Sequence, residues 1–207
     1  AVLRGAVAGL SPEARLSGPL PTPRLPERAL NELARQPTIA AVAALLALWR
    51  SPYALPLAAA QHGKPDLLEL EVALGRQIGA DQLQAAGGDP GWGDFVRESL
   101  DLDNLRTALI LAGRGDEIPP DHLFIPGGAV LTAERFARVA RAPDAAEGYR
   151  IAAPAWAGTP LAAAVDRGQH APLALEPELA DLRRRAWRRR ARTEPLGAAP
   201  VVHYLLR

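Results

Sequence analysis

The sequence has no cysteine, no methionine and only one lysine, Lys64. Without cysteine the chain has no disulfide, no thiol nucleophile and no thiolate metal ligand, which fits a reducing compartment. Aromatic residues make up 5% of the chain and β-branched residues are scarce, whereas alanine and leucine are abundant. Because alanine and leucine favour helices, and β-branched and aromatic residues favour strands, this composition predicts an all-α fold.

Long apolar runs and a strong excess of one charge are missing as well. The longest apolar run, Ile39 to Trp49, is far shorter than the roughly 20 residues that a membrane-spanning helix needs. The net charge of +1 provides no overall attraction to nucleic acid. The chain has no methionine at position 1 and stops inside the helical pattern Tyr204-Leu-Leu-Arg207. We therefore expect a fragment that lacks its natural start and end.

Candidate nucleophiles and metal ligands are few. Serine occurs only at positions 11, 17, 51 and 99, and none lies in the Gly-x-Ser-x-Gly motif of hydrolases. Zinc sites need clustered ligands, and no i,i+4 pair occurs among the histidines, which are His62, His122, His170 and His203. We therefore expect no catalytic, cofactor-binding or metal-binding residue, and no small-molecule substrate.

The segment Gly87-Gly-Asp-Pro-Gly-Trp-Gly93 has the glycine content of a phosphate-binding loop. Such a loop needs Lys-Ser or Lys-Thr at the start of the following helix to hold phosphate and magnesium. Here Asp94 and Phe95 follow, and the aspartate would repel phosphate. We expect a loop that binds no nucleotide.

Three carboxylates lie close together in the sequence, at Glu98, Asp101 and Asp103. Paired carboxylates can perform acid–base catalysis where burial separates their pKa values, which leaves a hydrolase or lyase as an alternative. However, Arg97 lies four residues before Asp101, and Arg106 lies three residues after Asp103. We therefore expect ordinary surface ion pairs at this spacing.

The strongest charge signal is Arg183-Arg-Arg-Ala-Trp-Arg-Arg-Arg-Ala-Arg192. These arginines could bind phosphates, with Trp187 available to stack on bases, so a helical nucleic-acid-binding module is the alternative function. Leu179, Leu182 and Ala186 still mark an apolar helix face. The arginines therefore also fit a solvated surface, or one that forms ion pairs with an acidic protein partner.

The chain resembles itself 106 positions later. The segment Leu25–Arg35 aligns without gaps on Leu131–Arg141. Matches at this offset are Leu3/Leu109, Gly9/Gly115, Leu30/Phe136, Leu33/Val139 and Val96/Val202, and Tyr53 matches Tyr149 after a contraction of ten residues. A repeat this long exceeds a short solenoid unit and indicates a copied helical module. We expect two modules, 1–115 lacking its natural start and 116–207 lacking its natural end.

Capping residues and apolar periodicity predict where the helices lie. Helix starts are expected after Ser11, Thr38, Ser51 and Thr132, because Ser and Thr are good N-caps and proline is tolerated at the first helical position. Further helices are expected at about 26–36, 66–78, 94–111, 145–153, 161–166 and 176–193, with 113–130 as a connector. In the helix 66–78, the stripe Leu67, Leu70, Leu74 and Ile78 is expected to face the core.

Several motifs follow one another in an order typical of a known family. Asp101-Leu-Asp-Asn-Leu-Arg106 precedes Phe124-Ile-Pro-Gly-Gly128 and a helix that begins with Leu131 and ends in Ala-Arg. Val2-Leu-Arg-Gly5, Ser51-Pro-Tyr53 and Leu70-Glu-Val-Ala-Leu74 lie upstream, and Pro200–Arg207 lies downstream. Together they resemble the C subunit of bacterial and archaeal V/A-type rotary ATPases, the counterpart of the d subunit of the eukaryotic vacuolar ATPase. The resemblance departs at Ile110, where the family tends to have an arginine, which the upstream copy keeps as Arg4.

The resemblance implies a funnel-like fold of repeated helical-bundle modules with pseudo-symmetry, and no chemistry of its own. It implies a peripheral subunit at the cytoplasmic face of the membrane, a socket that couples the central stalk to the membrane rotor ring. The partners would be the central-stalk subunits and the rotor ring, and the role would be torque transmission in proton or sodium transport. The alternative remains nucleic-acid binding by the helix 183–192.

Overall fold

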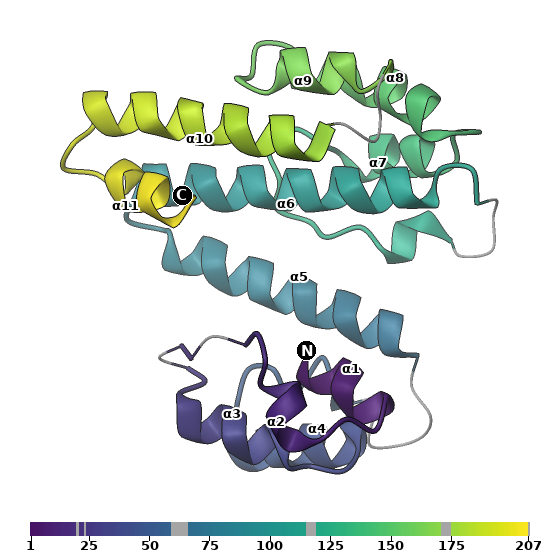
Figure 1. Ribbon diagram of the computed structural model, residues 1–207, viewed down its shortest axis with the longest axis vertical. Helices are drawn as coiled ribbons and strands as arrows, with labels where there is room; N and C mark the ends of the chain where they lie inside the picture. Colours follow the sequence, from purple (N-terminus) through teal and green to yellow (C-terminus); the bar gives the residue numbers. More distant parts are fainter. Residues whose placement is uncertain (20, 23, 59–65, 115–118, 171–174, 207) are drawn as a thin grey trace. The chain divides into compact units, whose positions relative to one another are not determined.

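The computed structural model describes the chain except for residues 20, 23, 59–65, 115–118, 171–174 and 207 and the side chains of residues 175 and 176. All regular structure in the described residues is helical, which confirms the predicted all-α fold (Figure 1). The chain divides into two compact units, Ala1–Gln77 and Ile78–Arg207, and the boundary falls inside helix α5.

The first unit contains α1 (Val2–Val7), α2 (Pro12–Arg15), α3 (Glu27–Ala34), α4 (Ile39–Leu48) and the first half of α5 (Leu67–Ala85). Its core is almost entirely aliphatic and consists of Leu3, Leu33, Ile39, Val42, Ala43, Leu46, Leu57 and Leu70. Two family-like segments meet here, because Arg4 Nε donates to Glu71 Oε1 at 2.6 Å. With Arg4 71% exposed, this pair contributes little to stability.

Among the described residues of the first unit, one charged side chain is buried. Arg15 is only 7% exposed and donates from Nε to the Leu10 carbonyl at 2.8 Å. Its Nη1 donates to the carbonyls of Ala34 at 3.1 Å and Gln36 at 2.5 Å, at the carboxyl end of α3. The last carbonyls of a helix have no partner within the helix, so the guanidinium satisfies them and complements the helix dipole.

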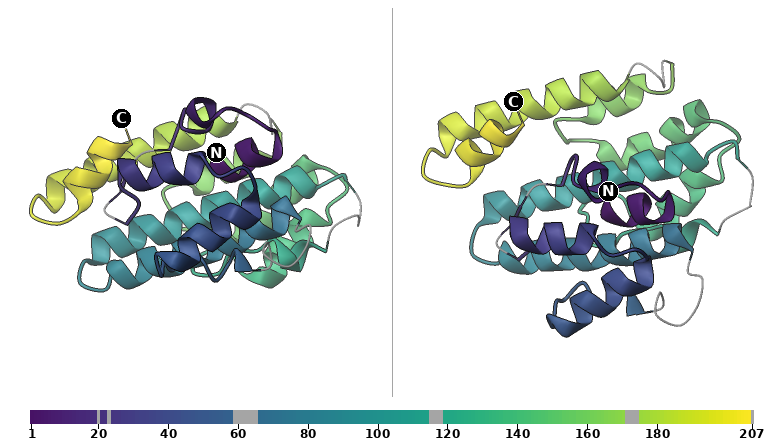
Figure 2. Two further views of the ribbon diagram at one scale, coloured as in Figure 1. Left: turned by 90° about the horizontal axis from the view of Figure 1, so that it is seen from below. Right: turned by 60° about the horizontal axis from the view of Figure 1, so that its bottom comes forward.

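The second unit is built along the long helix α6 (Pro90–Leu111). Its other elements are the 3-10 turn η2 (Pro120–His122), α7 (Ala133–Ala140), α8 (Ala145–Trp156), α9 (Ala162–Arg167), α10 (Leu175–Thr193) and α11 (Ala199–Leu205). Helices α7, α8 and α11 all contact α6. Helices α10 and α11 form a hairpin joined by residues 194–198 (Figure 2).

The sequence repeat recurs in the helix boundaries and in the buried faces. Helix α3 and helix α7 are both eight residues long and lie 106 positions apart. Three pairs of buried residues occupy matching positions, which are Leu30/Phe136, Leu33/Val139 and Ala34/Ala140. Ala137 is buried as well, whereas Asn31 at its matching position is only partly buried. The next helices, α4 and α8, also begin at this offset. The same local structure is therefore formed twice, with different side chains filling equivalent places.

The helix caps recur as well. The Thr38 hydroxyl accepts from the Ala41 amide at 3.2 Å at the start of α4. The Asp144 carboxylate accepts from the Glu147 amide at 2.8 Å at the start of α8. The predicted caps Ser11 and Thr132 are confirmed in the same way, with distances of 3.3 Å each to the amides of Ala14 and Arg135.

Two predictions about helix starts are wrong. Ser51-Pro52 does not begin a helix, and residues 52–57 form turns instead. Pro56 would be the fifth residue of such a helix, where a proline removes the donor of an i→i−4 hydrogen bond and clashes with the carbonyl one turn earlier. The glycine-rich segment is not all loop, since α6 begins at Pro90 and Asp89 caps it by accepting from the Trp92 amide at 3.1 Å.

Two predicted placements in the repeat and core also differ from the structure. Ile78 is 40% exposed, although Leu67, Leu70 and Leu74 of the same stripe pack in or against the core of the first unit. Tyr53 lies in the turn after α4, whereas Tyr149 lies inside α8, so these two residues are not equivalent. The position that matches Tyr149 at the 106-residue offset is Ala43, which is also buried.

The compact units divide at 77/78, and α6, α7 and α8 belong to one unit because α7 and α8 pack on α6. The modules 1–115 and 116–207 are defined by the sequence repeat, and their boundary stays a prediction. The end of α6 is therefore an interior connection of the second unit.

The matched caps give a test of the repeat. We expect Thr38→Ala and Asp144→Ala each to lower the free energy of unfolding by about 0.5–2 kcal/mol, because each leaves a helix amide unsatisfied. Urea unfolding followed by circular dichroism measures this change. Thr38→Ser and Asp144→Ser keep the acceptor and should recover most of the loss; equal losses in the serine and alanine variants would show that these side chains do not act as caps.

Candidate functional site

The family-like motifs of the second unit meet at a buried carboxylate. Asp101 is completely buried on α6. Its Oδ2 accepts from the amides of Ala129 at 2.8 Å and Val130 at 3.0 Å, and its Oδ1 accepts from the Leu131 amide at 2.8 Å. One side chain thus fixes three consecutive residues of the connector that leads into α7.

Asn104, one helical turn later, binds the same connector. Its Nδ2 donates to the Ile125 carbonyl at 2.7 Å, and its Oδ1 accepts from the Ile125 amide at 2.9 Å. Asn104 is 1% exposed, so both halves of its amide are satisfied out of contact with water. A carboxylate could not replace it, because the Ile125 carbonyl requires a donor.

The Pro-Gly-Gly segment provides the space for these bonds. Gly127 has φ +112°, a conformation that residues with a Cβ rarely adopt. A Cβ on Gly128 would overlap Oδ1 of Asp101. The motifs Asp101–Arg106 and Phe124–Gly128 are therefore two halves of one structural lock, which we call the connector lock and define as Asp101, Asn104, Ile125 and residues 127–131.

The electrostatics of Asp101 reflect two opposing effects. Burial raises the pKa of Asp101 above its ordinary value, while the hydrogen bonds from Leu131, Ala129 and Val130 act in the opposite direction by stabilising the carboxylate. The burial of Asp101 and its hydrogen bonds both result from its contact with the connector. No other carboxylate among the described residues accepts a hydrogen bond from these three amides.

A second polar cluster joins α10 to the first half of α6. Glu98 Oε1 accepts from Arg183 Nε at 2.6 Å and from Trp187 Nε1 at 3.0 Å. The Arg183 guanidinium also lies 4.7 Å from the centre of the Phe95 ring, and Phe95 packs edge-on against Trp187. Because Arg183 and Glu98 are only 15% and 20% exposed, this pair is shielded from solvent more than a surface ion pair.

The three candidate catalytic carboxylates do not converge. Glu98 faces α10, Asp101 binds the connector, and Asp103 lies on the surface with Arg106 Nη1 at 3.3 Å. The predicted Asp103–Arg106 pair is confirmed. The predicted Arg97–Asp101 pair is wrong, since Arg97 instead lies 4.0 Å from Asp94 and Asp101 is buried against backbone amides.

The histidines are placed apart from one another. His122 belongs to η2, His170 follows α9 and His203 belongs to α11, while His62 lies outside the described residues. Within the described part of the chain, no three histidine, aspartate or glutamate side chains are close enough to form a metal site.

The arginine-rich segment forms the second half of α10, but its tryptophan is not available. Trp187 is 4% exposed and belongs to a core cluster with Ala199 and Val202. The expectation that Trp187 could stack on bases is therefore wrong. Arg190 is also occupied, with Nη1 2.7 Å from Asp94 Oδ2 and its guanidinium over the Trp187 ring at 5.1 Å.

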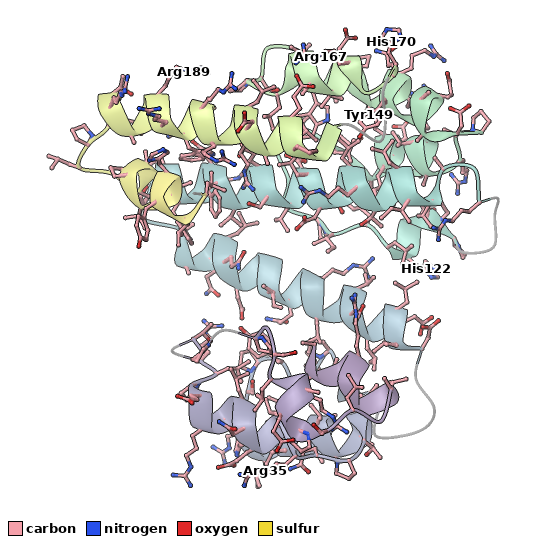
Figure 3. All side chains as sticks on the ribbon, viewed as in Figure 1. Arg35, His122, Tyr149, Arg167, His170 and Arg189 are labelled. Carbon is pink, nitrogen blue, oxygen red and sulfur yellow. The ribbon has the colours of Figure 1, made fainter. Side chains whose placement is uncertain are left out.

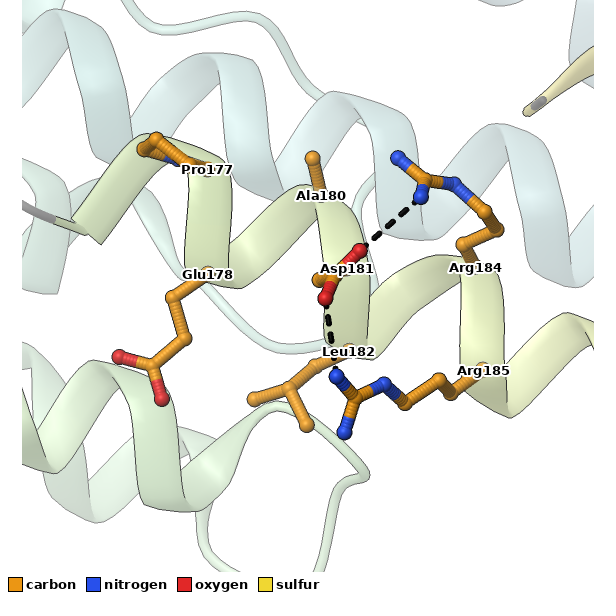
Figure 4. A pocket seen from close by; sticks show the side chains of 7 residues that line it. All are labelled: Pro177, Glu178, Ala180, Asp181, Leu182, Arg184 and Arg185. Atoms are coloured by element: carbon orange, nitrogen blue, oxygen red, sulfur yellow. Dashed lines mark hydrogen bonds and ion pairs between the residues drawn. The ribbon is translucent and has the colours of Figure 1, made fainter.

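A groove of about 600 Å³ lies along α10. It is bordered by Pro177, Glu178, Ala180, Asp181, Leu182, Arg184 and Arg185 (Figure 4). None of the helices in the described ranges has the length and apolar character needed to span a bilayer. The fold and its polar clusters define an all-helical protein, in which the motifs Asp101–Arg106 and Phe124–Gly128 attach a connector to α6.

Comparison with known proteins identifies the family. The chain belongs to the family described as ATP synthase (C/AC39) subunit, which it matches over residues 1–207. Two relatives, each named as the C subunit of V-type ATP synthase and both from strains of Thermus thermophilus, are 35% identical to it over 102 residues. That match covers 48% of this chain and 31% of each relative. The resemblance inferred from the motifs is thus confirmed at the level of the family.

The connector lock can be tested with a neighbouring control. We expect Asp101→Asn to lower the free energy of unfolding by about 1–3 kcal/mol, because the new amide group would point a donor at a backbone N–H. Hydrogen exchange at the amides of residues 129–131 should accelerate. Asp103→Asn removes a surface carboxylate two positions away and should change stability much less; equal effects of the two substitutions would contradict the lock.

The raised pKa of Asp101 predicts a pH dependence with a definite sign. The folded state holds this proton more tightly than the unfolded state, so the contribution of Asp101 is complete below the ordinary aspartate pKa of 3.8 and is lost as the pH rises through the raised pKa. The difference in unfolding free energy between wild type and Asp101→Asn should therefore shrink over this window. Urea titrations at several pH values measure it, and a difference that grows with pH would show that the hydrogen bonds outweigh burial.

Proposed function

We propose that this protein is a non-catalytic subunit of a V/A-type rotary ATPase, a socket that couples the central stalk to the membrane rotor ring. It would bind as a peripheral subunit at the cytoplasmic face of the membrane and transmit torque during proton or sodium transport. The observation that carries this proposal is the family match over residues 1–207.

The internal construction supports a mechanical role. A subunit that transmits force needs elements that do not move against one another, and close packing with satisfied buried polar groups provides this. In the second unit, Asp101 and Asn104 fasten the connector to α6, and Glu98 fastens α10 to the same helix. Repetition of helices and caps at a fixed offset supports an arrangement of similar modules within the subunit.

The alternative of a nucleic-acid-binding module receives less support. Its stacking residue, Trp187, is buried, and Arg183 and Arg190 are bound to Glu98 and Asp94. Single-strand binding depends on exposed aromatic rings beside basic residues. The remaining arginines of α10 can bind anions, but without a ring to stack on bases.

The proposed role predicts a separation of two activities. In source cells that lack the gene for this chain, we expect ATP-driven ion transport into inverted membrane vesicles to be lost, while the detached catalytic head still hydrolyses ATP. The reason is that a coupling subunit contributes contacts between motor parts and no chemical step. Reintroduction of the wild-type gene should restore transport, and reintroduction of Arg138→Ala, an exposed substitution on α7, serves as the matched control.

Two results would contradict the proposal. Transport that stays coupled without the chain would remove the coupling role. Loss of ATP hydrolysis by the isolated catalytic head would instead indicate that the chain participates in catalysis or in assembly of the head.

A further inference from the structure

Helix α10 carries arginines on two opposite faces. Arg183 and Arg190 lie on the face that packs against α6, together with Trp187, and both are bound to carboxylates of α6. The opposite face carries Arg185, Arg188, Arg189 and Arg192, which follow the i, i+3, i+4, i+7 spacing of one helix face and are all exposed. Figure 3 shows Arg189 projecting from the side of α10 away from α6. We call these four residues the outer arginine face.

The outer arginine face has few counter-charges within the described structure. Arg185 shares Asp181 with Arg184, with Nη2 of Arg185 2.9 Å from Oδ2 and Nη1 of Arg184 2.9 Å from Oδ1 (Figure 4). Arg188, Arg189 and Arg192 form no ion pair among the described residues. Like charges at this spacing repel one another along a helix, so a partner that supplies carboxylates would relieve the repulsion.

A groove beside this face is suited to acidic side chains. It has a volume of about 490 Å³ and is lined by Asp181, Arg184, Arg185, Arg188 and His203. Asp181 lies between two guanidinium groups and orients both. A guanidinium that is already oriented binds a carboxylate at a smaller cost in side-chain entropy.

We propose that the outer arginine face binds an acidic helix of a neighbouring protein subunit, with carboxylates at matching i, i+3, i+4 and i+7 positions. The stripe from Arg185 to Arg192 extends about 10 Å along the helix, or two turns. This inference rests on the proposed function, because it takes the partner to be another subunit of the same complex.

Charge and burial favour a protein over nucleic acid or a lipid surface. Glu178 and Asp181 lie at the amino-terminal end of the outer arginine face, whereas Glu194 pairs with Arg190 of the opposite face. Glu178 and Asp181 would repel a phosphate backbone or a layer of anionic headgroups that continued past this end, whereas an acidic helix two turns long would contact only the four arginines. Trp187, the one aromatic residue of α10, is buried and offers no stacking surface.

The experiment measures binding of the purified protein to a synthetic helical peptide with glutamates at i, i+3, i+4 and i+7, by fluorescence anisotropy. A peptide of the same composition with its glutamates distributed around the helix is the first control. We expect R188E/R189E to weaken binding of the striped peptide by about tenfold or more, because it reverses two charges of the face. The affinity of the wild type should fall as salt is added.

The matched control variant is R114E/R138E, which reverses two exposed arginines without ion pairs among the described residues and should leave the affinity unchanged. Circular dichroism of both variants verifies the fold. Equal binding of the two peptides, or equal effects of the two variants, would overturn the proposal. It would also be overturned if duplex DNA or phosphatidylserine vesicles bound the wild type more tightly than the striped peptide and lost binding in R188E/R189E.

Failure of this inference is distinguishable from failure of the proposed function. Stripe-specific peptide binding together with unchanged ion transport in cells without the chain would support the surface and remove the coupling role. Loss of transport without stripe-specific binding would support the coupling role and remove the surface.

Discussion

The attachment of the connector to α6 is the constraint on which the second unit depends. Apart from η2, the described part of this connector has no helical hydrogen bonds to satisfy its backbone, and Leu131 at its end is buried. Burial of unpaired amides costs free energy, and Asp101 and Asn104 remove that cost by bonding to five backbone groups. The position of α7, and with it the packing of α8, follows from this attachment.

Helix α6 contacts two different elements along its length. Its first half supplies Phe95 and Glu98 to α10, and its second half supplies Asp101 and Asn104 to the connector. The offset of the repeat aligns Val96 of α6 with Val202 of α11, and both are buried. Helix α11 therefore lies at the repeat positions of residues 93–99 of α6.

The sequence predicted features that depend on near neighbours, and missed those that depend on distant ones. Thr38 and Thr132 could be identified as caps because their acceptor and donor lie within one turn. The hydrogen-bond partners of Asp101 could not be predicted, because they lie 28 to 30 residues away in the sequence. Arg97 lies closer in the sequence, but Asp101 does not pair with it. The family motifs still contained the signal, since an Asp and an Asn three residues apart preceded a Pro-Gly-Gly segment. The partners of Glu98, 85 and 89 residues away, gave no signal in the sequence.

The double use of α6 restricts how its length can change during evolution. Each residue of a helix advances the rotation by about 100°. A single-residue insertion between Glu98 and Asp101 would keep both side chains on the helix. It would, however, rotate Glu98 by about 100° relative to Asp101 and Asn104. Glu98 would lose α10, or Asp101 and Asn104 would lose the connector. Homologous chains should therefore tolerate substitutions along α6 far more readily than insertions or deletions, and length variation should accumulate in the loops that flank it.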